Sequence, residues 1–276
     1  MNSYNFLYNL RDKIPVSIKV LFPKFLRRKI NKKFFPYYFL STDLKSLPNL
    51  NYDENEISNL EYQKKLLREF NDTEKLNSFM TCPHLTQLLS IKFNCNDNFS
   101  FLDIGGESID FYLDLKKKFK NVEYFIFNKD PVNKIFDVLK QEFNLIDITI
   151  INNIEEIFNK KFDFVNFGSC IQYINNYENI LNEITNNNNC IFFSGTTLYN
   201  SKKDVLQKNL VVKQVNTSTR SNYLFFFNKR YFYEIFIKKN FELTFEEKNL
   251  TDNINYNNFG KYLKKIQYTD FLFTKK

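Results

Sequence analysis

The sequence predicts an α/β fold in which helices cover both faces of a mostly parallel sheet, with a helical extension before it. From Phe99 onward, short apolar runs alternate with amphipathic segments, which is typical of a doubly wound sheet. The first of these runs ends in an Asp and two glycines directly before a helical pattern. The 276 residues, of which 43% are hydrophobic, suffice for one large domain and an extension.

Each element of the domain follows from this alternation. Apolar runs predict strands at 99–104, 122–128, 146–151, 162–167 and 190–194, with later strands at 241–247 and 266–274. Amphipathic segments predict helices at 109–119, 132–143, 177–184 and 229–239. The polar stretch 198–222 is expected to form a loop or lid. The chain therefore divides into a basic amphipathic arm at 1–40, a helical lead-in at 41–98, a core at 99–248 and a C-terminal tail at 249–276.

Basic residues are concentrated at the N-terminus. Residues 1–36 contain nine lysines and arginines against Asp12 alone, so this segment accounts for the chain's formal charge of +8. We expect either a helix packed on the core or contact of residues 11–36 with an anionic membrane surface. A nucleic-acid interface is not expected, because no binding motif accompanies the cluster. The lead-in predicts two helices, at 56–70 and 76–93, the second broken or bent near Pro83.

The composition excludes several kinds of site. The four cysteines lie far apart and His84 is the single histidine, so no metal site is expected. No apolar run of about eighteen residues and no signal-peptide pattern is present, so we expect a cytoplasmic protein. The chain has no Ala or Trp and abundant Asn, Lys, Ile, Phe and Tyr, which indicates an AT-rich genome. Its many asparagines are therefore poor evidence of function by themselves.

The turn after the first predicted strand carries the functional hypothesis. It reads Leu102-Asp103-Ile104-Gly105-Gly106-Glu107-Ser108. In an open parallel sheet, ligands bind beyond the carboxyl ends of the strands. Gly105 lets the backbone approach a ligand, the helix start that follows favours a carboxylate, and Asp103 can meet an ammonium group. The turn therefore predicts a zwitterionic amino-acid ligand rather than a pyrophosphate.

This turn resembles the first motif of class I S-adenosylmethionine-dependent methyltransferases. Residues 162–174 (Phe-Asp-Phe-Val-Asn-Phe-Gly-Ser-Cys-Ile-Gln-Tyr-Ile) and 223–243 extend the resemblance to methyltransferases of bacterial surface-polysaccharide (O-antigen and capsule) gene clusters. The resemblance covers residues 40–250 and implies a Rossmann-like sheet of seven strands and S-adenosylmethionine as cofactor. It also implies methyl transfer to a hydroxyl or other group of a glycan precursor, such as a nucleotide sugar or a lipid-linked sugar. The enzyme would then work in the cytoplasm, peripherally at the inner face of the membrane.

The resemblance also implies which residues form the cofactor site. They are Asp103, Gly105, Gly106, Glu107, Asn128, Asn153, Phe167, Gly168 and Ser169. Glu107 stands near the place of a further glycine. Asn128 and the Asn152-Asn153 pair stand where acidic residues usually hold the ribose and the adenine, and asparagine accepts hydrogen bonds without the strength of a carboxylate. Candidates for catalytic groups are His84, Gln172 and Tyr173, and none of them is assigned as the general base.

Two other functions stay open. A catalytically degenerate methyltransferase fold, used for binding or as a scaffold in glycan assembly, would account for the asparagines and the missing glycine. The intact Asp103, Gly105 and Gly106 oppose it. An NAD-dependent sugar oxidoreductase would require G-x-G-x-x-G after the first strand, and the residues from Gly105 to Ser108 do not have that spacing.

Overall fold

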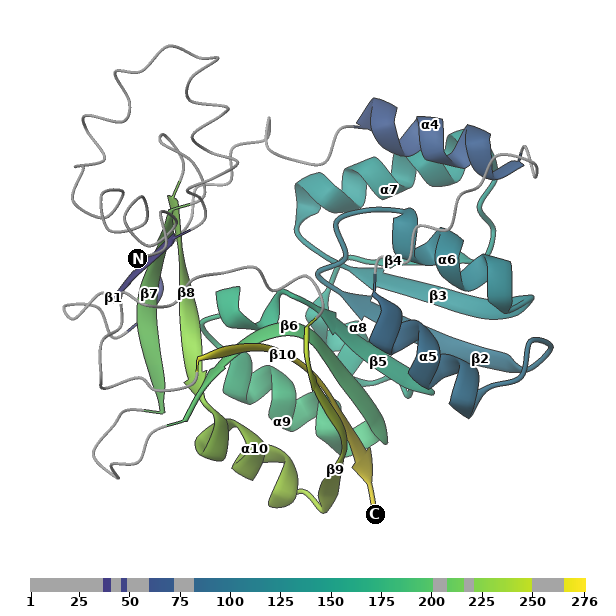
Figure 1. Cartoon of the computed structure of the whole chain (residues 1–276). Coiled ribbons are helices and arrows are strands. Elements are labelled where there is room, and N and C mark those ends of the chain that lie inside the picture. Colours follow the sequence, from purple (N-terminus) through teal and green to yellow (C-terminus); the bar gives the residue numbers. More distant parts are fainter. Residues whose placement is uncertain are drawn as a thin grey trace, which may run out of the picture.

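A single sheet of ten strands organises the described part of the chain, three strands more than the seven expected, because β1, β7 and β8 extend it beyond β6. The computed structural model describes residues 37–40, 46–48, 60–71, 82–200, 208–215, 221–249 and 266–276. Seven strands lie in the order β4-β3-β2-β5-β6-β10-β9 (Figure 1). Their bounds are Asn98–Ile104 (β2), Asn121–Phe127 (β3), Ile148–Ile151 (β4), Phe164–Gly168 (β5), Cys190–Tyr199 (β6), Phe241–Lys248 (β9) and Gln267–Lys275 (β10). Among these seven, β10 alone runs against the others, so the predicted mostly parallel sheet is confirmed.

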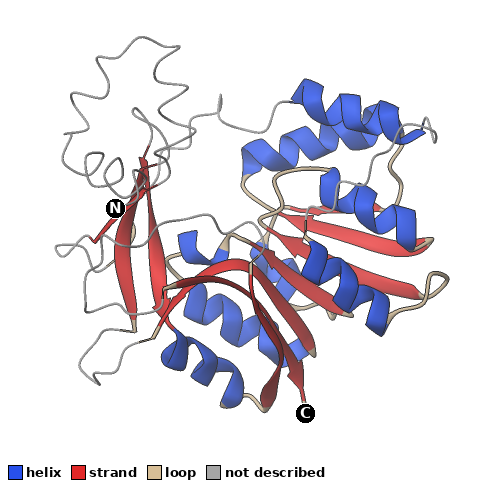
Figure 2. Ribbon diagram, in the orientation of Figure 1, coloured by secondary structure: helices blue, strands red, loops and turns tan. Residues whose placement is uncertain are grey.

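Helices cover both faces of this sheet (Figure 2). One face carries α4 (Leu60–Asn71), α5 (Pro83–Lys92), α6 (Asp110–Lys118) and α7 (Asp130–Phe143). The other carries α8 (Ile154–Phe158), α9 (Tyr177–Asn187) and α10 (Lys229–Ile237). We call these the α6 face and the α9 face. The two separate apolar clusters confirm the doubly wound arrangement that the strand and helix alternation predicts.

The strands alternate their side chains between the two faces, as a pleated strand must. In β2, Phe101 packs into the cluster of the α6 face and Leu102 into that of the α9 face. Phe164 and Val165 of β5 divide in the same way. All four side chains are fully buried, and each contributes roughly 1.5–3 kcal/mol by leaving water. This alternation also decides which residues at the strand ends can reach a ligand on a given face.

The prediction of a loop or lid at 198–222 is wrong for the described part of that segment. β6 extends to Tyr199, and β7 (Asn209–Val215) pairs antiparallel with β8 (Ser221–Asn228). β1 (Tyr37–Leu40), which the sequence analysis placed in the basic arm, pairs with β7. Leu210, Val212, Leu224 and Phe226 bury one side of this extension together with Tyr199. Val211, Phe225 and Phe227 are buried on the opposite side of the extension, so both of its sides contribute to apolar clusters.

The N-terminal predictions fall largely outside the described residues. These include the basic arm up to residue 36, the first residues of both lead-in helices, and most of the tail before β10. The predicted helices at 56–70 and 76–93 correspond to α4 and α5, and α5 begins at Pro83, where proline suits a first helical turn. The helix α8 was not predicted. Within the described part of the chain, no helix is long and apolar enough to span a bilayer.

Candidate functional site

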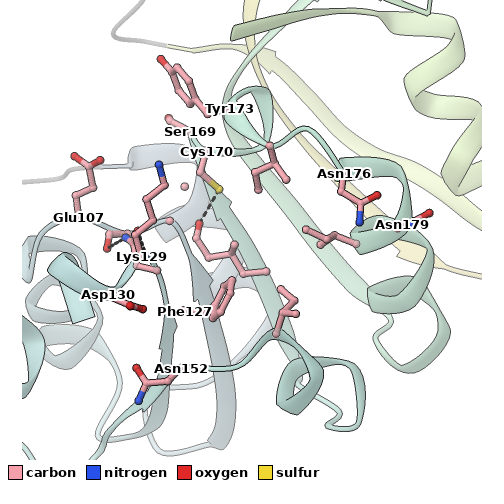
Figure 3. A pocket seen from close by; sticks show the side chains of 18 of the residues that line it. Glu107, Phe127, Lys129, Asp130, Asn152, Ser169, Cys170, Tyr173, Asn176 and Asn179 are labelled. Carbon is pink, nitrogen blue, oxygen red and sulfur yellow. Dashed lines mark hydrogen bonds between the residues drawn. The ribbon is translucent and has the colours of Figure 1, made fainter. Parts of the chain in front are cut away.

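A cleft of about 1240 Å³ opens at the carboxyl ends of β2, β3, β4 and β5 (Figure 3). Its walls come from the turn after β2, the end of β3, the segment from Asn152 into α8, the segment after β5, and α9. Six of the nine residues predicted for the cofactor site line it: Gly105, Gly106, Glu107, Asn128, Gly168 and Ser169. The volume exceeds that of most small-molecule pockets, so it has room for a nucleoside and a second ligand.

The glycine turn, Gly105-Gly106, packs closely against Cys170 and Asp103. Gly105 has φ +82°, and a Cβ there would overlap the Cβ and Sγ atoms of Cys170. The Cys170 Sγ donates to the carbonyl oxygen of Ile104 at 3.0 Å. A Cβ on Gly106 would overlap the carboxylate of Asp103. Both glycines are therefore required by these close contacts. Cys170 itself lines the cleft, whereas Asp103 does not.

Asp103 does not line the cleft, and its predicted contact with a ligand ammonium group is not supported. It lies on the α6 face of β2, whereas the cleft opens over α8 and α9 on the other face. The side chain is buried, and its carboxylate accepts hydrogen bonds from the Tyr124 hydroxyl at 2.5 Å and the Asn166 amide at 2.8 Å. Burial raises the pKa of Asp103 to about 6, although both hydrogen bonds act to lower it. Asp103 packs against Gly106 of the turn from the α6 face of the sheet.

At the end of β3, Asn128 lies in the cleft wall but its amide is engaged. Its Nδ2 donates to the carbonyl oxygen of Gly106 at 2.8 Å, and its Oδ1 accepts from the backbone N–H of Lys129 at 2.8 Å. Asn128 therefore ties β3 to the glycine turn. Two residues later, Asp130 also lines the cleft and is exposed; its carboxylate has no hydrogen bond to a described residue. The sequence analysis missed Asp130, although an acidic residue before Pro131 at a helix start was a readable signal.

The asparagine pair after β4 separates into two roles. Asn152 lines the cleft and accepts a hydrogen bond from Asn133 at 2.9 Å. Asn153, which was predicted to bind cofactor, does not line it; its side chain caps α8 by accepting from the Glu155 N–H at 3.2 Å. The apolar side chains of Ile154 and Phe158 continue the wall into α8.

The segment after β5 brings a strained residue to the cleft. Ser169 has φ +53°, which is uncommon for a residue with a side chain, and its hydroxyl lies 3.2 Å from the hydroxyl of Tyr268. Phe167, also predicted for the cofactor site, is instead fully buried and stacks on Phe193 with 4.9 Å between ring centroids. Phe167 therefore belongs to the core beneath the cleft.

The three candidates for catalytic groups do not come together. Tyr173 lines the cleft, and its hydroxyl donates to the Gln214 side chain at 2.9 Å. Gln172 is buried and donates to the carbonyl oxygens of Ser169 and Gly195, so it shapes the wall from behind. His84 does not line the cleft; its Nδ1 lies 2.8 Å from the carboxylate of Asp270 on β10.

Charge in the described cleft wall is mostly negative. Four carboxylates line it, against one lysine, Lys129. The carboxylates are those of Glu107, Asp130, Glu155 and Glu183. Partial burial lowers the pKa of Lys129, and the charge of Glu107 acts in the opposite direction. A wall of this kind is complementary to a ligand of net positive charge.

No family model matches the sequence, and no curated protein matches it either. Among solved structures, the sarcosine dimethylglycine methyltransferase of Galdieria sulphuraria is similar over 70% of this chain and 84% of its own, with 10% identity and a TM-score of 0.50. This likeness shows the fold. The N-terminal domain of EvdMO1, solved with SAH and D-fucose, covers 77% and 96% at 9% identity and TM-score 0.47. An S-adenosylmethionine-dependent methyltransferase of Clostridium acetobutylicum covers 77% and 98% at 9% identity and TM-score 0.45.

Proposed function

We propose that this chain is an enzyme that transfers a methyl group from S-adenosylmethionine. The observation that carries the proposal is the charge of the cleft beside the glycine turn: four carboxylates against one lysine. S-adenosylmethionine has a sulfonium, an ammonium and one carboxylate group, so its net charge is positive. A nucleotide with a pyrophosphate has the opposite charge and would be repelled by this wall.

The residues present suit the parts of that cofactor. The exposed carboxylate of Asp130 is placed to accept hydrogen bonds from ribose hydroxyls, the role that an acidic residue at Asn128 would otherwise have. The side-chain amide of Asn152 can form a hydrogen bond with the adenine, beside the apolar side chains of Ile154 and Phe158. When bound, the cofactor supplies a methyl group on an already activated sulfonium. The chain therefore has to align the two ligands and exclude water.

The acceptor is proposed to be a hydroxyl or another group of a sugar or glycan precursor. The cleft wall carries hydroxyl and amide side chains that suit a polyol. They are Tyr173, Asn176, Asn179, Asn222 and Tyr268. Transfer of label from S-adenosylmethionine to uncharged sugars and oligosaccharides, and none to small amines or amino acids, is the expected result. Labelling of the amines alone would contradict the sugar acceptor.

Contact of residues 11–36 with the inner face of a membrane is part of the same proposal, and that segment lies outside the described residues.

Calorimetric titration separates the proposal from its alternatives. S-adenosylmethionine and S-adenosylhomocysteine should bind the full chain, and NAD should not. Binding of NAD alone would favour the oxidoreductase. A scaffold protein that has lost its cofactor, which the amides at Asn128 and Asn152 favour, would bind none of the three. Replacing Asp130 with Asn should weaken binding of both adenosine compounds by about tenfold, because a charged hydrogen bond becomes a neutral one.

A further inference from the structure

We propose that Lys129 and Glu107 bind the amino-acid end of the bound nucleoside. Lys129 contacts the carboxylate of the ligand, and Glu107 contacts the ammonium group of the ligand. The inference rests on the proposed function and assigns those two charges to named side chains. From the residues of the turn, the sequence predicts these roles for Asp103 and for the start of the following helix. The structure makes neither of them suitable, and it places two other charges on the cleft.

Asp103 is separated from the cleft by the turn that it supports. Its side chain is 2% exposed, and the two donors Tyr124 and Asn166 occupy its oxygens on the α6 face. The turn packs directly against its carboxylate, because a Cβ on Gly106 would lie 2.2 Å from Asp103 Oδ2. A ligand ammonium group would have to displace the turn to reach it. The contact is therefore excluded while the turn keeps this conformation.

The start of α6 is also engaged. The backbone N–H of Ile109 donates to Gln63 Oε1 at 3.1 Å, and the N–H of Asp110 donates to Ser108 Oγ at 3.4 Å. Asp110 adds a negative charge to the first turn of the helix. A ligand carboxylate gains less there, because two of the amide groups are already bonded and the nearby charge of Asp110 has the wrong sign.

Lys129 supplies the positive charge that a carboxylate needs. It follows β3 directly and is the one cation among the described residues that line the cleft. Figure 3 shows its side chain extending from the end of β3 toward the level of Glu107 and Cys170. Partial burial disfavours the charged form of its amine and lowers its pKa. A ligand carboxylate beside this ammonium group would further favour its charged form.

Glu107, in the connection that follows β2, supplies the negative charge. It is exposed in the turn after β2 and lines the cleft, and its charge acts on Lys129. The two side chains thus present opposite charges from neighbouring strands, β2 and β3, at one end of the site. A zwitterionic group matches such a pair. Glu107 stands near the place where the resemblance has a further glycine. In this assignment Glu107 has a function of its own, because its side chain contacts the ligand.

Comparison of two ligands tests this assignment directly. S-adenosylhomocysteine has the amino-acid end, and 5′-methylthioadenosine lacks it and is otherwise the same nucleoside thioether. We expect the full chain to bind the first about tenfold or more tightly than the second, the size expected for charged hydrogen bonds. Lys129→Met and Glu107→Gln should each remove most of that difference by weakening S-adenosylhomocysteine alone. Lys129→Arg should keep it.

Two exposed residues outside the cleft, a lysine and a glutamate, provide matched controls. Lys134 is exposed on α7 outside the cleft, and Glu156 is exposed on α8 outside it. Lys134→Met and Glu156→Gln should leave both affinities unchanged, and thermal unfolding of every variant checks that it is folded. Equal loss of both ligands in Lys129→Met and Glu107→Gln, or equal affinity of the two ligands for the unmodified chain, overturns the assignment and leaves the proposed function standing. Failure of the unmodified chain to bind either ligand overturns both.

Discussion

At the scale of single residues, burial decides which of the motif's groups meet a ligand. Asp103 and Ile104 are consecutive, yet Ile104 lines the cleft and Asp103 faces the other side of the sheet. The sequence shows that an acidic residue ends the strand, and strand periodicity alone places it on one face. Which face carries the cleft depends on where α8 and α9 pack, and α8 was not predicted. For the same reason Asn152, rather than Asn153, lines the site.

The raised pKa of Asp103 predicts a pH-dependent stability. The pKa is about 6 in the folded chain against an ordinary value of 3.8, so the folded state favours the protonated carboxyl group. Stability from this group is therefore fully present below about pH 4 and is lost as the pH rises through about 6. Ionised Asp103 costs roughly 3 kcal/mol at neutral pH. Asp103→Asn should then be more stable than the unmodified chain at about pH 7.5, with the gap closing toward about pH 4.5.

Urea unfolding of the two proteins at several pH values measures this difference. Taking the difference between them cancels the titration of the other carboxyl groups. A gap that does not change with pH, or one that widens on acidification, would show that Asp103 is not a destabilised anion in the folded chain.

The glycines of the site give a second prediction. Gly105→Ala forces a side chain into the left-handed region and against Cys170, so it should destabilise the chain by about 1–3 kcal/mol. Gly168→Ala is the matched control in the same cleft, because its Cβ would meet no atom closer than 3.4 Å. Equal thermal stability of the two variants would contradict the close packing described for the turn.

At the scale of elements, α4 is connected to the site by one buried side chain. Gln63 is fully buried, accepts from the Ile109 N–H at 3.1 Å, and donates to the Glu107 carbonyl oxygen at 3.4 Å. Gln63→Ala should cost about 1–3 kcal/mol, because a buried N–H loses its partner. It should also weaken S-adenosylhomocysteine binding, since the turn that carries Glu107 loses a support.

Gln87, which is exposed on α5, provides the comparison for that change. Gln87→Ala should alter neither stability nor affinity. If the two alanine variants behave alike in unfolding and in calorimetric titration, α4 does not position the glycine turn.

The elements themselves were predicted where their apolar pattern was strong. The strands from 99 to 194 and the helices between them lie within a few residues of their predicted positions, except for the length of β6 and the short α8. β7 was missed because polar residues such as Lys213 and Gln214 make the stretch 198–222 polar on average, although Leu210, Val211 and Val212 are buried. The pairing of β7 with β1 joins residues far apart in the chain, which no local pattern reveals.

At the scale of the whole molecule, topology brings the site together. Residues from β2, β3, β4 and β5 meet because parallel strands end at the same edge of the sheet. The sequence predicts this edge, and six of the nine residues it predicts for the cofactor site line the cleft. The negative charge of the cleft wall was not predicted, because Glu155 and Glu183 lie on helices whose relation to the glycine turn exists only in the folded chain.

The most direct measurement is a crystal structure of the full chain grown with S-adenosylhomocysteine. We expect the nucleoside beside Gly105 and Gly106, with its ribose at Asp130 and its amino-acid end between Lys129 and Glu107. A ligand bound elsewhere on the chain, or a cleft that stays empty at saturating ligand while the protein is folded, would contradict the account.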